Sequence, residues 1–108
     1  MLAQDLAVKA AGEVHRLVEK VPPNARDLAD RARRAAASVP LNLAEASGRA
    51  GRDRLQHHRI ALGSSKEATA CVQLLSSIGV VDAQRAREAL ALLDRVNALT
   101  WRLSHHRG

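Results

Sequence analysis

Polar side chains recur every three or four residues through the middle of this chain, beside an apolar stripe with the same period. This spacing places side chains along one edge of a helix. These side chains, together with two polar residues further along the chain, supply carboxylates, hydroxyls, an amide and a guanidinium. We interpret them as a structural polar network that fixes how two helices pair. Its members are Arg34, Ser38, Asn42, Glu45, Ser64 and Glu67.

Catalysis is the alternative use of these groups. Glu45 or Glu67 would be the reacting carboxylate, but the sequence offers neither a nucleophile, a set of metal ligands nor a general base to work with it. The sequence therefore predicts no enzyme, no catalytic residue and no cofactor.

Arginine is concentrated in the same part of the chain. Four arginines and two histidines fall within the eleven residues 49–59, and Arg31 and Arg33 lie further down the second helix. Guanidinium groups bind phosphates well, so this cluster predicts salt-dependent, sequence-independent contact with RNA or DNA. The alternative is a solvated basic surface without a ligand. The candidate phosphate contacts are Arg31, Arg33, Arg49, Arg52, Arg54 and Arg59.

Histidines are the only candidates for metal ligands. His57-His58 and His105-His106 are adjacent pairs, and adjacent residues on a helix point about 100° apart. Neither pair has the i, i+4 spacing that chelates a metal from one helix face. We expect no metal site within the chain, and clusters between subunits remain the alternative.

Composition limits the class of protein. The chain has 108 residues and a net charge of +6, with most of the excess carried by arginine, which indicates either a polyanionic partner or a GC-rich genome. Its apolar residues are aliphatic, with no Phe or Tyr, and Trp101 is the single aromatic. With one aromatic we expect no stacking readout of single strands, and we expect Trp101 to serve packing or a subunit interface.

Cysteine usage and hydropathy indicate the compartment. Cys71 has no partner for a disulfide and lies in an apolar helical stripe, so we expect a buried core residue. No segment has the length and apolarity of a signal peptide or a membrane span. The sequence predicts a cytoplasmic protein without membrane contact and a single domain over residues 1–108.

Apolar periodicity predicts four helices, over about 3–20, 25–48, 52–78 and 82–104. Pro22 and Pro23 end the first, and Gly48 and Gly51 form the turn after the second. Pro40 lies inside the second helix and predicts a kink there. The expected core face of the third helix is Ile60, Ala61, Ser64, Ala68, Cys71, Leu75 and Ile78, and that of the fourth, after a cap at Asp82, is Ala89, Leu92, Val96, Leu99 and Leu103.

Short connections between helices of this length predict an all-α, antiparallel up-down four-helix bundle with a proline-kinked second helix. Folding helices two and three about Ala50 places residues whose numbers sum to about 101 opposite each other. We therefore expect Arg34 to face and pair with Glu67, and Ser38 to face Gly63, where a glycine would let the helices approach closely. Asn42 or Glu45 would then reach Arg59.

The central stretch also carries a recognisable pattern. Arg34-Ala35 is followed by Ser38-Val39-Pro40-Leu41-Asn42-Leu43-Ala44-Glu45 and Gly48-Arg49, and further along come Ile60-Ala61 and Gly63-Ser64 with Glu67. This arrangement resembles the four-helix-bundle family first noticed as proteins encoded in 23S rRNA intervening sequences. The likeness extends over all four helices.

The resemblance implies a four-helix protomer that assembles as a cyclic homopentamer and has no established enzymatic activity. A related group, the accessory variability determinant of diversity-generating retroelements, is similar to a basic pentamer that binds a reverse transcriptase and nucleic acid. Five copies of a chain with charge +6 would carry +30. Two functions follow as alternatives: binding of RNA or DNA, and an adaptor assembly whose partner is another protein such as a reverse transcriptase.

Overall fold

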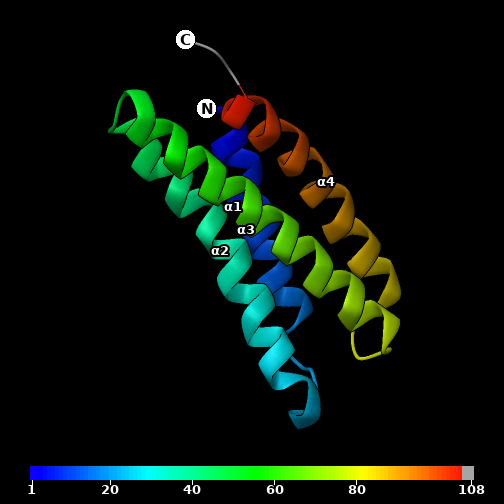
Figure 1. Ribbon diagram of the computed structural model, residues 1–108. Coiled ribbons are helices and arrows are strands. Elements are labelled where there is room, and N and C mark those ends of the chain that lie inside the picture. Colours follow the sequence, from blue (N-terminus) through cyan, green and yellow to red (C-terminus); the bar gives the residue numbers. More distant parts are fainter. Residues whose placement is uncertain (106–108) are drawn as a thin grey trace.

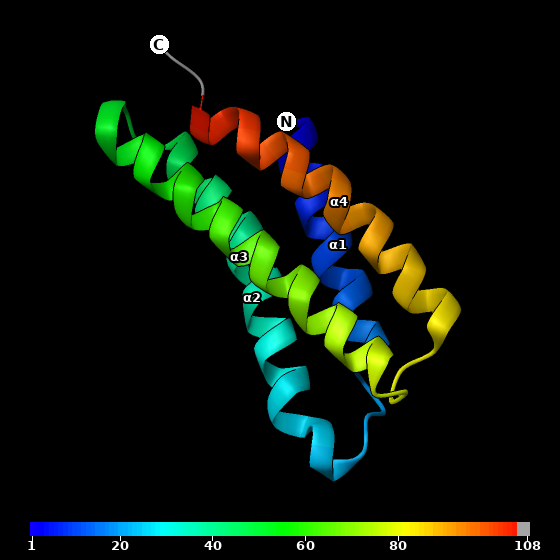
Figure 2. The ribbon, with the colours of Figure 1, turned by 45° about the vertical axis from the view of Figure 1, so that its right-hand side comes forward.

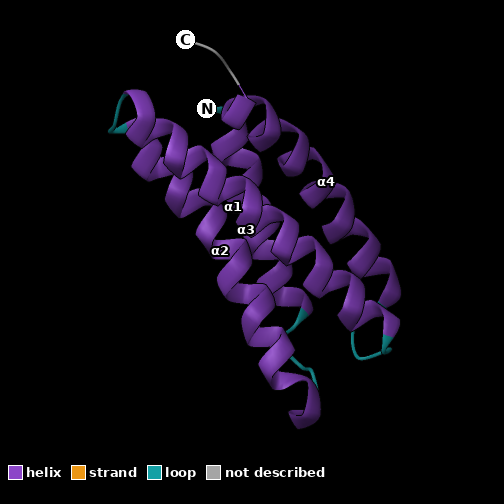
Figure 3. Ribbon diagram, viewed as in Figure 1, coloured by secondary structure: helices purple, strands orange, loops and turns teal. Residues whose placement is uncertain are grey.

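The computed structural model describes residues 1–105, and these residues form four long helices joined by short turns (Figures 1 and 3). A single 3-10 turn, Pro23–Ala25, precedes the second helix, and the described residues contain no strand. The prediction of an all-α chain is confirmed. The helices are α1 (Leu2–Leu17), α2 (Arg26–Ser47), α3 (Gly51–Ser77) and α4 (Ala83–His105).

Each helix packs against the next one along the chain, and α4 returns to pack against α1. The result is an elongated bundle with extents of 44 × 21 × 17 Å (Figure 2). The turn between α2 and α3, the start of α1 and the end of α4 all lie at one end of it (Figure 1). The predicted four-helix bundle is therefore confirmed, and the turn with its arginines lies at the same end as Trp101.

Local sequence explains where the helices begin and end. The first helix ends at Leu17, earlier than predicted, and residues 18–20 form a turn ahead of the two prolines. Gly79, at φ +76°, follows α3, and the Val80 N–H bonds the Leu75 carbonyl, which closes the helix in a glycine-dependent cap. The Asp82 carboxylate accepts the backbone N–H of Arg85, as predicted for the cap of α4.

The core is built from alanine, valine and leucine, and its position on α3 corrects the prediction. Ser65 and Val72 are buried, whereas Ile60 and Ile78 are 39% and 57% exposed. α3 packs against both α2 and α4, so its buried stripe is centred between them, about one residue further round the helix than the apolar pattern suggested.

The core stripe of α4 is also displaced from the prediction. Thr100 and Ser104 are buried, while Leu92, Leu99 and Leu103 are only partly buried. The Thr100 hydroxyl donates to the Val96 carbonyl and the Ser104 hydroxyl donates to the Trp101 carbonyl. These bonds within the helix satisfy the hydroxyls, so small polar residues can occupy the core.

Two features of α2 and α3 concern the glycine and proline of the central stretch. α2 continues through Pro40, and a kink there stays a prediction. The predicted close approach at Gly63 is wrong, because a Cβ built on Gly63 would meet no atom within 4 Å. Gly63 is exposed on α3, and no neighbouring atom of the protomer requires a glycine at this position.

Candidate nucleic-acid interface

A hydrogen-bonded cluster joins α2 to α3 near the middle of the hairpin. The hydroxyl oxygens of Ser38 and Ser64 lie 2.8 Å apart, and Asn42 Nδ2 donates to both the Ser38 carbonyl and the Ser38 hydroxyl. On its other side, Asn42 Oδ1 lies 2.9 Å from Nδ1 of His57. The cluster is half-buried, so it links the two helices where water has limited access.

The same geometry determines which nitrogen of His57 carries the proton. Asn42 Oδ1 can only accept, so Nδ1 of His57 must be the donor, and Nε2 of a neutral His57 ring is unprotonated. His57 was not among the predicted network residues, and Asn42 bonds it in place of Arg59. The spacing of Asn42 and His57 fits the predicted hairpin register, which is the signal that would have found the pair.

The charged members of the predicted network lie apart from this cluster. The Arg34–Glu67 ion pair is not formed, because Glu67 pairs with Arg31, with a distance of 3.4 Å from Arg31 Nε to the carboxylate. Arg31 lies about one turn before Arg34 on the same edge of α2, so a long side chain from either position comes near Glu67. Arg34 is exposed, and Glu45 pairs with Arg49.

A second polar cluster, absent from the sequence-based prediction, joins α3 to α4. The buried Ser65 hydroxyl donates to Asn97 Oδ1, and Asn97 Nδ2 donates to the Thr69 hydroxyl, which itself donates to the Ser65 carbonyl. α3 is therefore held by one asparagine from each neighbouring helix. The missed signal is Asn97, a polar residue at helical spacing within the stripe of α4.

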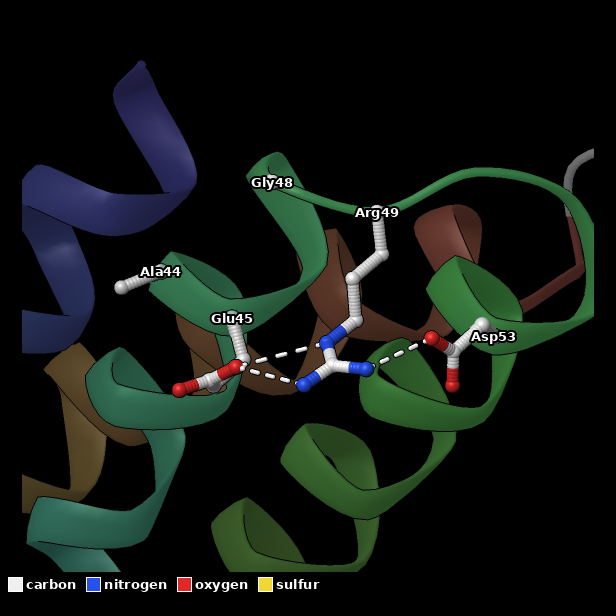
Figure 4. A pocket seen from close by; sticks show the side chains of 5 residues that line it. All are labelled: Ala44, Glu45, Gly48, Arg49 and Asp53. Atoms are coloured by element: carbon white, nitrogen blue, oxygen red, sulfur yellow. Dashed lines mark hydrogen bonds and ion pairs between the residues drawn. The ribbon is translucent and has the colours of Figure 1, made fainter.

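The turn between α2 and α3 contains a shallow hollow lined by Ala44, Glu45, Gly48, Arg49 and Asp53. Arg49 lies between the two carboxylates, 2.6 Å from Asp53 and 3.1 Å from Glu45 (Figure 4). The hydrogen bond from Arg49 lowers the pKa of Asp53, and the bonds to Asp53 and Glu45 raise the pKa of Arg49. One arginine against two carboxylates gives this hollow a net negative charge, which disfavours a phosphate.

Arg54 has a structural partner of a different kind. Its Nε donates to the carbonyls of Arg49 and Ala46, at 2.9 and 3.3 Å. These carbonyls belong to the turn and to the last turn of α2, where the helix dipole favours a positive charge. Arg54 therefore stabilises the end of α2.

The six predicted phosphate contacts thus divide into three groups, and Arg54, bonded to backbone carbonyls, forms one of them. Arg31, Arg33 and Arg49 pair with Glu67, Asp30 and the two turn carboxylates. Arg52 and Arg59 are exposed, and neither has a carboxylate partner within residues 1–105.

Lys66 lies in line with Arg52 and Arg59, the two arginines that have no carboxylate partner within residues 1–105. Arg52, Arg59 and Lys66 follow one another at steps of seven residues on α3, so they share one face of the helix. All three are exposed, and a rise of 1.5 Å per residue separates neighbours by about 10 Å. We call these three residues the basic stripe. Lys66 was not among the predicted phosphate contacts, all six of which are arginines.

Metal binding and thiol chemistry have little support. Among residues 1–105 no three His, Cys, Asp or Glu side chains lie close enough to hold a metal ion, and His106 lies outside the described residues. Cys71 is buried, and burial together with the nearby Glu67 charge raises the pKa of its thiol. None of the described helices has the length and apolarity that crossing a membrane requires.

Comparison with known proteins places this geometry in a family. The family model of the 23S rRNA-intervening sequence proteins matches residues 2–102. The chain belongs to this family. A comparison with curated proteins finds no match. The resemblance seen in the central stretch is therefore confirmed at the level of the family.

A solved structure shows the same fold. It is a protein of unknown function from the S23 ribosomal protein family of Bacteroides thetaiotaomicron, with a TM-score of 0.84 and 18% sequence identity. The match covers 96% of this chain and 99% of that chain. At this identity the likeness concerns the fold alone.

Proposed function

We propose that this 23S rRNA-intervening sequence protein is a non-enzymatic, self-assembling helical bundle that binds the backbone of RNA or DNA. The basic stripe carries the proposal, because Arg52, Arg59 and Lys66 are exposed cations that no carboxylate neutralises within residues 1–105. Cations of this kind gain affinity by releasing counterions from phosphates, without reading the base sequence.

Self-assembly would increase the affinity for nucleic acid that three cations alone can give. Three cations in one protomer give weak binding, but several copies would present several stripes to one polymer. The resemblance implies a homopentamer, which would have about five times the 11.6 kDa mass of the chain. Exposed apolar side chains, among them Leu41 at 65% and Leu74 at 53%, offer surface for contacts between copies.

A matched pair of triple variants tests the proposed function. R52Q/R59Q/K66Q removes the basic stripe, and R31Q/R33Q/R49Q removes three cations that are already paired, so both lower the net charge equally. Fluorescence anisotropy of a labelled mixed-sequence RNA, measured across a salt series, gives the affinity of each assembled protein.

We expect the stripe variant to lose most binding and to flatten the slope of log K against log salt by about 2, since each single-strand phosphate contact contributes about 0.7. The paired-arginine variant should retain most of both quantities. Equal losses in the two variants would show that net charge alone governs binding and would remove the basic stripe from the proposal.

An adaptor function is the second candidate. Leu41, Ile60, Leu74 and Ile78 are apolar and between 39% and 65% exposed on α2 and α3, which would suit a protein partner such as a reverse transcriptase. Light scattering separates the two candidates. A stable assembly whose mass does not change with RNA or DNA at low salt would favour the adaptor.

A further inference from the structure

Trp101, the only aromatic residue besides histidine, is not buried by the bundle. Its side chain is 51% exposed, although tryptophan is usually well buried and this core contains no other large ring. An exposed large aromatic on a small domain commonly marks a surface that meets a partner. The sequence led us to expect packing or a subunit interface for Trp101 and no stacking on single strands, but packing within the protomer covers only half of it, which reopens the question of stacking.

Contacts on either side of Trp101 show which way it faces. Asn97, one turn earlier on α4, bonds Ser65 and Thr69 of α3. His58 of α3 lies close to the backbone of Leu103, just beyond Trp101. Trp101 therefore lies on the edge of α4 that faces α3. Its level along the bundle falls between His58 and Ser65 of α3, and so between Arg59 and Lys66 of the basic stripe.

His105, one turn later on α4, holds the indole ring in place. The rings of Trp101 and His105 stack with their centroids 4.1 Å apart and their planes 17° from parallel. His105 Nδ1 lies 2.7 Å from the Trp101 carbonyl, which can only accept, so His105 donates and is fixed to the same turn of α4. The stack covers one face of the indole, and the residue as a whole remains half-exposed.

We propose that Trp101 is a stacking platform for one base of a single-stranded RNA or DNA whose phosphates follow the basic stripe. This inference rests on the proposed function and names the form of nucleic acid that the site accepts. Every base has a π-face, so stacking on an aromatic ring is tolerant of sequence, but a duplex keeps those faces stacked on its own neighbours. The level of the ring falls between Arg59 and Lys66, so one strand could meet both a cation and the indole.

The single tryptophan makes a direct assay. Intrinsic fluorescence of the assembled protein reports on Trp101 alone, and anisotropy of a labelled oligouridylate reports on binding independently of it. We expect oligouridylate at low salt to quench the tryptophan emission and a hairpin duplex of similar charge to leave it unchanged. W101A should weaken oligouridylate binding about fivefold to a hundredfold while keeping the salt slope, since stacking is worth that much per base.

Control variants test whether the loss of binding comes from the Trp101 ring. W101F should retain part of the affinity, and V8A, which truncates a half-exposed apolar side chain on α1, should leave it unchanged. Oligouridylate binding without quenching, or with W101A equal to wild type, overturns the platform while the basic stripe stands. Shielding of Trp101 from iodide in the assembly without nucleic acid would place it in a subunit contact and also overturn the platform. Anisotropy that does not change with any nucleic acid overturns the proposed function itself.

Discussion

Substitution of Asn42 by alanine tests whether the α2–α3 cluster fixes the hairpin. Asn42 makes three hydrogen bonds, two to Ser38 in its own helix and one to His57 across the interface. A net hydrogen bond contributes about 1 kcal/mol. Loss of all three would therefore destabilise by about 3 kcal/mol if water replaced none of them.

Two effects reduce this figure. The cluster is half-buried, so water can partly replace the lost partner. Alanine also has a higher helix propensity than asparagine, by about 0.6 kcal/mol. We expect N42A to lower the free energy of unfolding by about 1 to 2 kcal/mol, which for a domain of this size lowers Tm by roughly 4 to 16 °C.

Urea unfolding followed by far-ultraviolet circular dichroism measures this effect, at several protein concentrations so that assembly is separated from protomer stability. Q73A is the matched control, because Gln73 is an exposed amide on α3 without a hydrogen bond to another side chain of residues 1–105. A double-mutant cycle with H57A should give a coupling energy of about 0.5 to 1.5 kcal/mol. An N42A protein within 0.3 kcal/mol of wild type, or a coupling of zero, would refute the role assigned to Asn42.

Three further predictions concern single residues. Burial, with Arg54 and His57 nearby, lowers the pKa of His58, so the unfolded chain binds the proton more readily and stability should fall as pH drops below about 6.5; urea unfolding across pH should show this slope flattened in H58N but kept in H15N. Cys71 is 4% exposed with a raised thiol pKa, so alkylation by iodoacetamide should be slow until urea unfolds the protein, and fast alkylation of the native state would contradict its place in the core. G63A should stabilise an isolated protomer by about 0.5 to 1 kcal/mol, because the added methyl meets no atom within 4 Å, and destabilisation or loss of assembly would show that another chain packs there.

Periodicity and chain-breaking residues predicted the fold well. The two prolines, the glycines of the turns and the Asp82 cap set the helix bounds to within three residues, because each acts on the backbone locally. The buried faces of α3 and α4 were harder to predict. Ser65, Thr100 and Ser104 are polar residues that are nevertheless buried. Thr100 and Ser104 bond carbonyls of their own helix, whereas the Ser65 bond to Asn97 becomes visible only once α4 is placed.

The hairpin register was predicted more closely than the partners within it. The bonded pairs 31/67, 38/64 and 42/57 all lie within three residues of the expected register. Arg34 and Arg31 share one edge of α2, so a register alone does not decide which of them reaches Glu67. Long charged side chains choose partners by local geometry, whereas the short Ser38 and Asn42 side chains contact only what the helix axis brings near them.

The partners of the arginines determine which surface of this protein a polyanion would contact. A sequence reading places the charge at the α2–α3 turn, but there Arg49 is held by two carboxylates and Arg54 by backbone carbonyls. The unpaired Arg52, Arg59 and Lys66 instead run along α3, parallel to the long dimension of the bundle. A ring of subunits would then present several basic stripes along its subunits, and not a single cluster of arginines at one end of the ring. A nucleic acid would lie along the subunits, so removing Lys66, far from the turn, should weaken binding as much as removing Arg52 beside it.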